Sequence, residues 1–138
     1  MTKQTKVVAM VQLPPPMHGA AQMNRHAVAA LTRNFDLHVI EMRFARTLSA
    51  LNRFSLRKVG VAIWLILLMI RALPRADALY ISFAPTGVAY YRDCLYVLVA
   101  KLFGVPAILH LHGRGLPAMR RSRWSQTLQQ LVFKDQPV

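Results

Sequence analysis

The opening strand-turn-helix pattern is the feature that most constrains the fold of this chain. An apolar run over residues 6–13 is ended by residues 14–16, all proline, and a helix-forming segment follows Gly19. Because proline has no N–H for a strand ladder, the run predicts a buried strand that stops at the prolines. Gly19 can take backbone angles closed to other residues, and the helix start presents unpaired N–H groups. This turn is either a place for a phosphate or carboxylate, or a plain connection.

The same alternation of apolar runs and helix-forming segments continues along the chain. Further strands are predicted at residues 37–42, 78–83 and 106–112, and helices at residues 20–32, 56–73, 88–103 and 116–133. Strands that alternate with helices form β-α-β units. The pattern therefore predicts an α/β fold, with an open parallel sheet covered by helices on both faces.

Several residues are assigned places within these elements. In the first helix, the spacing predicts a sheet-packed face, made of Met23, Ala27, Ala30 and Leu31. Asn34 is a predicted helix exit, because asparagine tolerates left-handed backbone angles, and Gly104 is a predicted C-terminal cap. Cys94 lies in an apolar stretch and is predicted to be a small core residue.

The carboxyl ends of the strands are the predicted ligand edge, as in other open parallel sheets. Residues 14–19, 84–87 and 110–115 meet at that edge. His112 stands at a strand end, where it projects towards a ligand or else is a core histidine bonded to backbone. Flexible or charged neighbours complete the set of candidates: His18, Thr86, Gly87, Gly113 and Arg114. For His110 a packing role is at least as well supported, and His26 and His38 are predicted to be structural or exposed.

Composition narrows the classes of partner. The 138 residues are 54% hydrophobic, and eighteen Lys+Arg against five Asp+Glu give a net charge of +13. This charge favours an anionic partner, namely nucleic acid, a phosphorylated ligand or an acidic membrane surface. The chain contains no Gly-x-Gly-x-x-Gly, P-loop or Gly-x-Ser-x-Gly pattern, and its single cysteine excludes an internal disulfide.

One apolar helix raises the question of a membrane. Residues 59–70 have no polar side chain, and Arg57, Lys58, Arg71 and Arg75 flank them. A spanning helix needs about 17–25 apolar residues, so this segment is too short, and a buried or interfacial helix is expected. The basic flanks predict peripheral binding to anionic bilayers, although a helix packed on the sheet with a solvated basic rim fits the same residues.

Three segments together resemble a known family. Residues 8–21, VAMVQLPPPMHGAA, resemble the opening of the GT-B fold glycosyltransferases of family 4. Residues 76–83, ADALYISF, resemble that family's "ADVVHIH" strand, and residues 102–113, LFGVPAILHLHG, resemble its "LGKPVVVTVHG" segment. The likeness covers nearly the whole chain, in the order and spacing of the amino-terminal half of such an enzyme.

The resemblance implies a domain organisation and a reaction. Residues 1–138 correspond to one Rossmann-like, acceptor-side domain, and the carboxyl-terminal donor domain with its Glu-x7-Glu motif lies outside them. The full enzyme moves a sugar from a nucleotide diphosphate donor, a co-substrate, to a hydroxyl of a glycan or lipid-linked acceptor. We expect no cofactor and no metal, a cytoplasmic location with peripheral attachment to the inner face of the membrane, and a place in bacterial cell-surface glycan assembly. The isolated domain is expected to be inactive.

The resemblance also implies roles for single residues. The family's glycine turn near the donor diphosphate corresponds to Gly19 and Ala20, where the usual second glycine is alanine. The family's strand-end histidine, which contacts the transferred sugar, corresponds to His112, and a family threonine is replaced by His110. The alternative is a non-enzymatic basic domain that binds nucleic acid or an anionic membrane. Nucleic acid is not expected, because the interleaved aromatic and basic residues of single-strand binders are missing.

Overall fold

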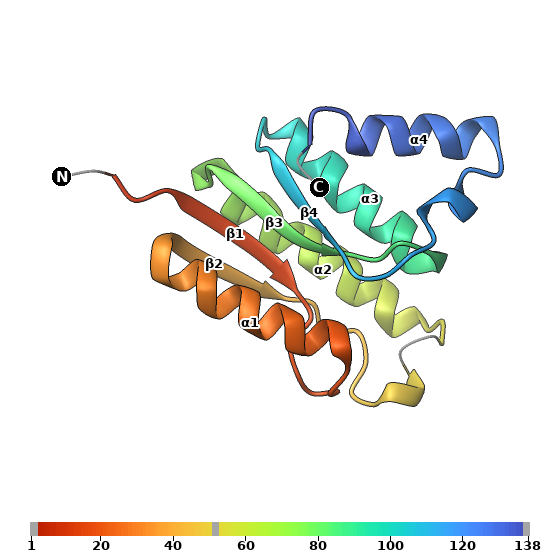
Figure 1. Ribbon diagram of the computed structural model, residues 1–138, viewed down its shortest axis with the longest axis horizontal. Coiled ribbons are helices and arrows are strands. Elements are labelled where there is room, and N and C mark those ends of the chain that lie inside the picture. The colour runs from red at the N-terminus through yellow and green to blue at the C-terminus, as the bar shows by residue number, and fades with distance from the viewer. Residues whose placement is uncertain (1–2, 51–52, 137–138) are drawn as a thin grey trace.

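The computed structural model describes residues 3–50 and 53–136. Four strands alternate with four helices in those ranges (Figure 1). In chain order the elements are β1 (Lys6–Val11), α1 (Gly19–Asn34), β2 (Asp36–Glu41), α2 (Leu56–Ala72), β3 (Ala78–Phe83), α3 (Gly87–Leu102), β4 (Ala107–Leu111) and α4 (Arg123–Phe133). Short 3₁₀ turns follow some of them: η1 (Leu48–Ala50), η2 (Leu73–Arg75) and η3 (Leu116–Met119).

The sheet has four parallel strands in the order β2-β1-β3-β4, which confirms the predicted Rossmann-like α/β fold. In register, Val8 of β1 lies opposite His38 of β2 on one side and Leu79 of β3 on the other. From β1 the chain moves to one edge, and from β2 it returns across β1 to form β3 and β4. The strand order therefore reverses between β1 and β3, and in folds of this kind ligands bind beyond the carboxyl ends of the strands at such a point.

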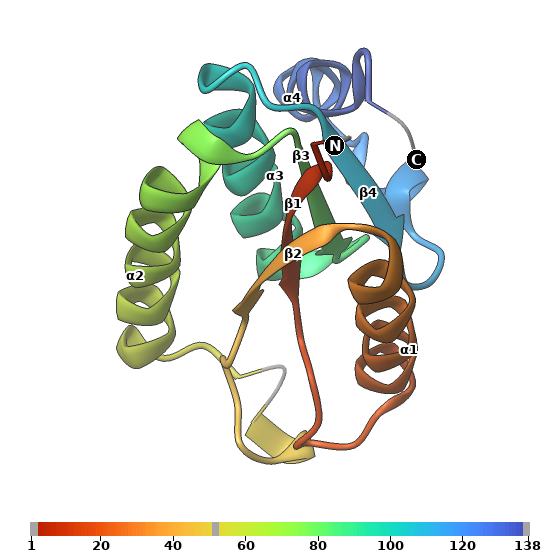
Figure 2. The same ribbon diagram turned by 90° about the vertical axis from the view of Figure 1, so that its left-hand side faces the viewer.

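Helices cover both faces of the sheet, but unequally. Figure 2 shows α1 on one side of the strands and α2 and α3 on the other. The α2–α3 side holds the larger part of the core, which includes Met10, Ile40, Leu65, Met69, Leu79, Ile81, Phe83, Tyr96 and Val97. The α1 side holds a smaller cluster built on Val7, Ala9, Val11 and Tyr80. Ile108 of β4 is 39% exposed, so the sheet is incompletely covered at that edge.

The face of α1 that packs on the sheet differs from the predicted one. Ala21 and Asn24 are fully buried, and Ala27, Val28 and Leu31 pack beside them. Met23 is 54% exposed and Ala30 also faces solvent, so their assignment to the packed face was wrong. The prediction followed apolar side chains alone, whereas the packed face of this helix contains a polar one.

The ends of two helices also differ from the prediction. The predicted helix over residues 116–133 is two elements, because α4 begins only after a cap at Ser122. The Ser122 hydroxyl accepts from the Ser125 N–H, which satisfies a free donor of the first turn. Helix α1 includes Asn34 and ends as Phe35 turns extended, so Asn34 provides no left-handed exit.

Two predicted core and cap residues are confirmed. Gly104 follows α3 with φ +68°, the left-handed angle that glycine adopts without a steric penalty. Cys94 is 1% exposed and packs in the core on the α3 side of the sheet. The buried thiol has a raised pKa of about 11, caused first by burial, so it is a packing residue and not a reactive one.

Candidate functional site

Two of the three predicted edge loops pack directly against each other. Gly115 has φ +136°, and a Cβ built on it would lie 2.4 Å from Thr86 Cγ2. Gly113 has φ +112°, and its Cβ would lie 3.8 Å from Pro85 Cγ. Both angles belong to the region that favours glycine, and the close approach at Gly115 leaves no room for a side chain. The loop after β4 therefore rests on the loop after β3, beside the point where the strand order reverses.

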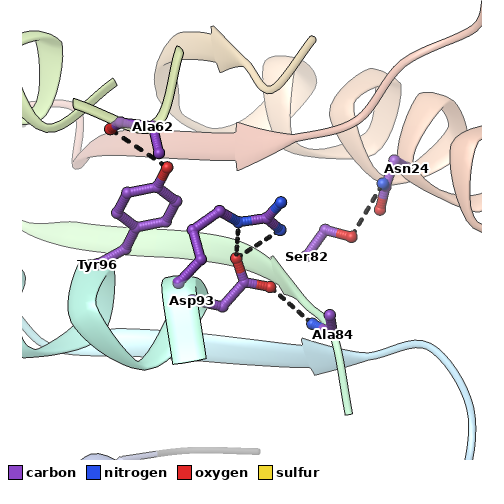
Figure 3. A network of polar contacts seen from close by, with 7 residues as sticks. Asn24, Ala62, Ser82, Ala84, Asp93 and Tyr96 are labelled. Carbon is purple, nitrogen blue, oxygen red and sulfur yellow. Dashed lines mark hydrogen bonds and ion pairs between the residues drawn. The ribbon is translucent and has the colours of Figure 1, made fainter. Parts of the chain in front are cut away.

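A buried asparagine joins this edge to α1. Asn24, fully buried, donates from Nδ2 to the Gln12 carbonyl at 2.9 Å and to Ser82 Oγ at 3.0 Å. Figure 3 shows Asn24 pointing from α1 to Ser82 on β3. His112 Nε2 lies 2.8 Å from Asn24 Oδ1. One side chain thus ties together the ends of β1, β3 and β4.

The network determines the protonation of the His112 ring. The Gln12 carbonyl can only accept, so the nitrogen of the Asn24 amide faces it and the oxygen faces His112. Nε2 of His112 must then carry the hydrogen and donate it. Within residues 3–50 and 53–136 no hydrogen bond reaches Nδ1 of His112. The neutral ring therefore offers Nδ1 as an acceptor to a bound molecule.

A second histidine packs on the first. The rings of His110 and His112 are 4.2 Å apart between centroids, and the Tyr80 hydroxyl shares a hydrogen bond with His110 Nδ1. Burial raises the pKa of Tyr80, so the phenol keeps its proton. His110 therefore bonds to the Tyr80 side chain and supports the His112 ring.

The charge state of His112 follows from this setting. Burial lowers the pKa of His112 below its ordinary value of 6.5, and the charges of His110 and His18 lower it further. The ring is neutral at neutral pH. The neutral His112 ring can bind a hydroxyl group. In this domain alone the ring is not protonated, so it cannot act as a general acid.

The first turn takes a form that the sequence did not indicate. His18 is the N-cap of α1, and its Nδ1 accepts from the Ala21 N–H at 3.3 Å. Gly19 lies outside the left-handed region, so the turn does not use its special conformational freedom. Within the described parts of the chain, the N–H groups of Gly19 and Ala20 meet no acceptor. Of the described groups that could bind a phosphate or carboxylate at this turn, these two N–H donors are the ones without a partner.

The loop after β3 starts a second helix at the same edge. Thr86 is the N-cap of α3, yet its side chain makes no capping hydrogen bond, and Gly87 follows with φ +74°. Thr86, Gly87 and Arg114 are exposed. No ion pair engages Arg114 in the ranges that the structure covers. The predicted loop residues thus leave a hydroxyl and a guanidinium turned towards solvent near His112.

An acidic residue anchors the start of this loop. Asp93 of α3 is fully buried, accepts from the Ala84 N–H at 2.8 Å and pairs with Arg92 at 2.7 Å (Figure 3). Burial raises the pKa of Asp93 to about 6, while Arg92 and the Ala84 N–H oppose that shift. The Arg92 guanidinium also lies 4.1 Å from the centroid of the Phe44 ring. Asp93 fixes the exit of β3 and so fixes the loop that Gly115 packs on.

The residues that hold the site together were absent from the sequence predictions. None of Asn24, Ser82, Tyr80 and Asp93 was assigned a role, although Tyr80 and Ser82 lie in the segment 76–83 that carries part of the family resemblance. A usable signal was present for two of them. Asn24 falls three residues after Ala21 on the inward side of a helix, and Ser82 is a polar residue inside an apolar strand. Buried polar residues must be bonded, so each position calls for a partner.

The smallest of three hollows in the described part of the structure touches the candidate site, and the two larger ones do not. A hollow of about 10 Å³ lies beside His18, between residues 12–18 and 42–45. Wider hollows of about 670 and 380 Å³ lie elsewhere, next to α4 and next to the end of α2. None of these three hollows is lined by His112 or Asn24. Among the described side chains, no group of three or more His, Cys, Asp or Glu is placed to hold a metal ion.

The fold class is established by this geometry: a Rossmann-like parallel α/β domain with a side-chain network at its switch point. Comparison of the chain with protein-family models, with curated proteins and with solved structures finds no match. The family is therefore not identified by likeness to other proteins. No helix within residues 3–50 and 53–136 is long and apolar enough to cross a membrane.

Proposed function

We propose that this chain is the acceptor-side domain of a glycosyltransferase that moves a sugar from a nucleotide diphosphate donor to an acceptor hydroxyl. The observation that carries the proposal is the position of His112. Its ring stands beyond the carboxyl end of β4, next to the switch point, and Asn24 holds its Nε2 at 2.8 Å. A fixed imidazole at this edge, with one ring nitrogen unused, suits the positioning of a polar ligand.

The chemistry of the edge matches the groups that sugar transfer presents. Nδ1 of His112 can accept a hydrogen bond from a sugar hydroxyl, while Nε2 stays bonded to Asn24. The N–H groups of Gly19 and Ala20 lie at the amino terminus of α1, and the amino terminus of α3 lies beside Thr86. Helix amino termini carry partial positive charge and stabilise a leaving diphosphate without a metal ion. The acceptor in this proposal is a glycan or a lipid-linked glycan, handled in the cytoplasm.

The donor side lies on another domain in this proposal. Glu41 is the only glutamate of the sequence, so these residues contain no Glu-x7-Glu pair. This domain supplies only half of a cleft, which is why we expect no sugar transfer from the 138 residues alone. Measurable turnover of a nucleotide-sugar by the purified chain would contradict the two-domain arrangement.

Ligand binding to the isolated domain is the first test. The ¹⁵N-labelled chain is titrated with nucleoside diphosphate sugars and with short oligosaccharides, and amide shifts are followed by NMR. We expect the largest shifts at Gly19, Gly87 and Gly113, and weaker binding in His112→Gln. His26→Gln, an exposed histidine on α1, is the matched control. Shifts that cluster away from these glycines, or equal binding by both variants, would refute the assignment of the site.

Turnover is the second test, made in a two-domain enzyme that contains these residues. The His112 ring is neutral, so the hydrogen bond is charge-assisted through the sugar, which gains positive charge in the transition state; such a bond contributes about 1.5–3 kcal/mol. His112→Ala is therefore expected to slow turnover by roughly ten- to a hundred-fold, since about 1.4 kcal/mol corresponds to a factor of ten. His110→Ala should lower mainly the stability, because His110 is bonded to Tyr80. Normal turnover of His112→Ala with a loss in His110→Ala would mean that the other histidine is the functional one.

A further inference from the structure

The outer side of α2 is apolar and faces solvent. Leu65 and Met69 point into the core and are at most 2% exposed. On the opposite side the exposed fractions are 82% for Leu56, 41% for Val59, 56% for Ile63, 54% for Trp64, 48% for Leu67 and 43% for Ile70. Figure 2 shows this helix at the margin of the molecule, away from α1. We call these six residues the α2 outer row.

The row is continuous along the helix. Its members recur at intervals of three and four residues, apart from the adjacent pair Ile63 and Trp64, which places them on one broad side of the α-helix. From Leu56 to Ile70 the row extends about 21 Å, at roughly 1.5 Å per residue. Soluble surfaces rarely leave a contiguous apolar row of this size uncovered, and such a row marks an interaction site. A partner with an apolar interior is therefore required.

Positive charge borders the row at both ends. Arg57 lies at the start of α2, Arg71 lies at its end, and Arg75 follows in η2; all three are exposed. None of the five acidic residues of the sequence lies on α2. In the described ranges the ion pairs are Arg43–Glu41 and Arg92–Asp93, so these three arginines have no acidic partner there. The three arginines can therefore contact a negatively charged surface, although Asp36 lines the same hollow as Arg71 and Arg75.

We propose that the α2 outer row binds the surface of an anionic lipid bilayer, with α2 lying in the plane of the interface. The apolar side chains enter the boundary between headgroups and acyl chains, and the arginines at both ends meet lipid phosphates. Helix α2 has 17 residues and carries a buried face, so it lies on the membrane and does not cross it. Trp64 at the flank of the row suits the interface, where tryptophan side chains gather.

A second copy of the chain fits this surface less well. Two molecules with a net charge of +13 each repel one another, and pairing along α2 would bring arginines together without a carboxylate between them. An anionic bilayer supplies both the apolar interior and the missing negative charge. This inference goes beyond the proposed function and does not depend on it, because a chain that bound lipid and no sugar would still uphold it.

Trp64 provides a reporter on the row itself. The chain has two tryptophans, and Trp124→Phe leaves Trp64 as the single emitter. This variant is mixed with vesicles of phosphatidylglycerol and phosphatidylcholine, and separately with vesicles of phosphatidylcholine alone. We expect a blue shift, and quenching by brominated acyl chains, with the anionic vesicles only. In the matched variant Trp64→Phe, emission from Trp124 should stay unchanged. Sedimentation with vesicles while Trp64 emission does not change would overturn the proposal.

Substitutions then separate the apolar and the charged parts. Ile63→Ser with Leu67→Ser should weaken partitioning to the anionic vesicles by about tenfold or more. Leu102→Ser, at an apolar residue of α3 that is 87% exposed, is the control and should bind normally.

Loss of charge is tested in the same way. Arg71→Gln with Arg75→Gln should weaken binding by about 25-fold at roughly 0.1 M salt and much less at roughly 0.5 M. Arg25→Gln with Arg33→Gln, on the far face of the sheet, is the control. Equal binding by all four variants, equal binding to neutral vesicles, or a stable dimer in solution that buries Trp64 would each refute the assignment to a bilayer.

Discussion

Removal of the Asn24 amide should damage the site more than its size suggests. Asn24→Ala deletes hydrogen bonds to the Gln12 carbonyl, to Ser82 Oγ and to His112 Nε2. A buried polar group left without a partner costs about 1–3 kcal/mol. Gln12 and His112 are only half-buried and can turn to water, whereas Ser82 is 8% exposed and cannot. With one full penalty and two partial ones, we expect a loss of about 2–4 kcal/mol in the free energy of unfolding.

Urea unfolding followed by circular dichroism measures this loss. Asn34→Ala is the matched control, because Asn34 lies on the same helix and its side chain bonds only to the exposed Ala30 carbonyl. That substitution should change the free energy of unfolding by about 0.5 kcal/mol or less, since alanine also favours the helix. If the two variants unfolded at the same urea concentration, Asn24 would not bond as the structure shows.

A second variant tests the contact with His112 directly. Asn24→Asp keeps the shape of the side chain but places a carboxylate beside the imidazole. A negative charge at this distance favours the imidazolium, so the pKa of His112 should rise, opposite to the effect of burial in the wild type. An NMR titration of the His112 ring protons reads this shift. An unchanged pKa of His112 would refute the network.

Two further predictions concern the loops and the pH profile. Gly115→Ala should destabilise the domain by about 2–4 kcal/mol, because its Cβ would meet Thr86 Cγ2 at 2.4 Å and φ is +136°. Adding Thr86→Ser should restore part of the lost stability. As the control, Gly19→Ala should leave thermal stability unchanged or higher. The contribution of His112 to stability should be lost as pH drops below 6.5, because its folded-state pKa is lowered and the unfolded chain takes up the proton first; Asp93, with a pKa raised to about 6, acts in the opposite sense and is present in both the wild type and His112→Gln. In urea unfolding measured at several pH values, His112→Gln should reduce this loss of stability below pH 6.5. The same loss in this variant and in the wild type would contradict its assignment to His112.

The sequence was sufficient for the layout of the fold and for the meeting of two loops at the carboxyl edge of the sheet. Apolar runs that alternate with helical segments leave a parallel sheet as the arrangement that buries them. The strand order β2-β1-β3-β4 was not predicted and comes from the structure. The prediction that Gly113 and its loop lie near residues 84–87 followed from the parallel arrangement alone. The packed loops confirm the placement, although Gly115 makes the close contact.

The interior of the site could not be predicted because it depends on which side of α1 meets the sheet. Counting apolar residues selected Met23 and Ala30, yet the helix packs through Ala21 and Asn24. Asn24 and its partner Ser82 are 58 residues apart, and no local rule joins them. The capping role of His18 was missed for a related reason, since a histidine is an uncommon N-cap.

The exposed apolar side of α2 could not be predicted from the sequence, because the helix is apolar on all sides. A helix that is apolar on all sides is ordinarily buried, and the sequence left a buried helix and an interfacial helix as equal choices. Only the packing decides, because α2 meets the sheet through one side, at Leu65 and Met69, and nothing in the described chain covers the other. Packing on the sheet therefore explains why the buried side of α2 is apolar. It does not explain why the α2 outer row is apolar.

The two proposed surfaces lie in places where both can act at once. In parallel α/β folds each helix runs against the strands, so α2 begins at the same carboxyl edge that holds His112. Yet α1 and its Asn24 contact lie on the opposite face of the sheet from α2 (Figure 2). A bilayer held by the α2 outer row therefore meets the amino end of that helix without covering the His112 network. If both proposals hold, an acceptor anchored in the bilayer reaches this edge from the membrane side, and the nucleotide donor reaches it from the aqueous side. The separation of the two faces lets each set of residues be altered with the other left in place, since sites more than about 10 Å apart without shared partners behave independently.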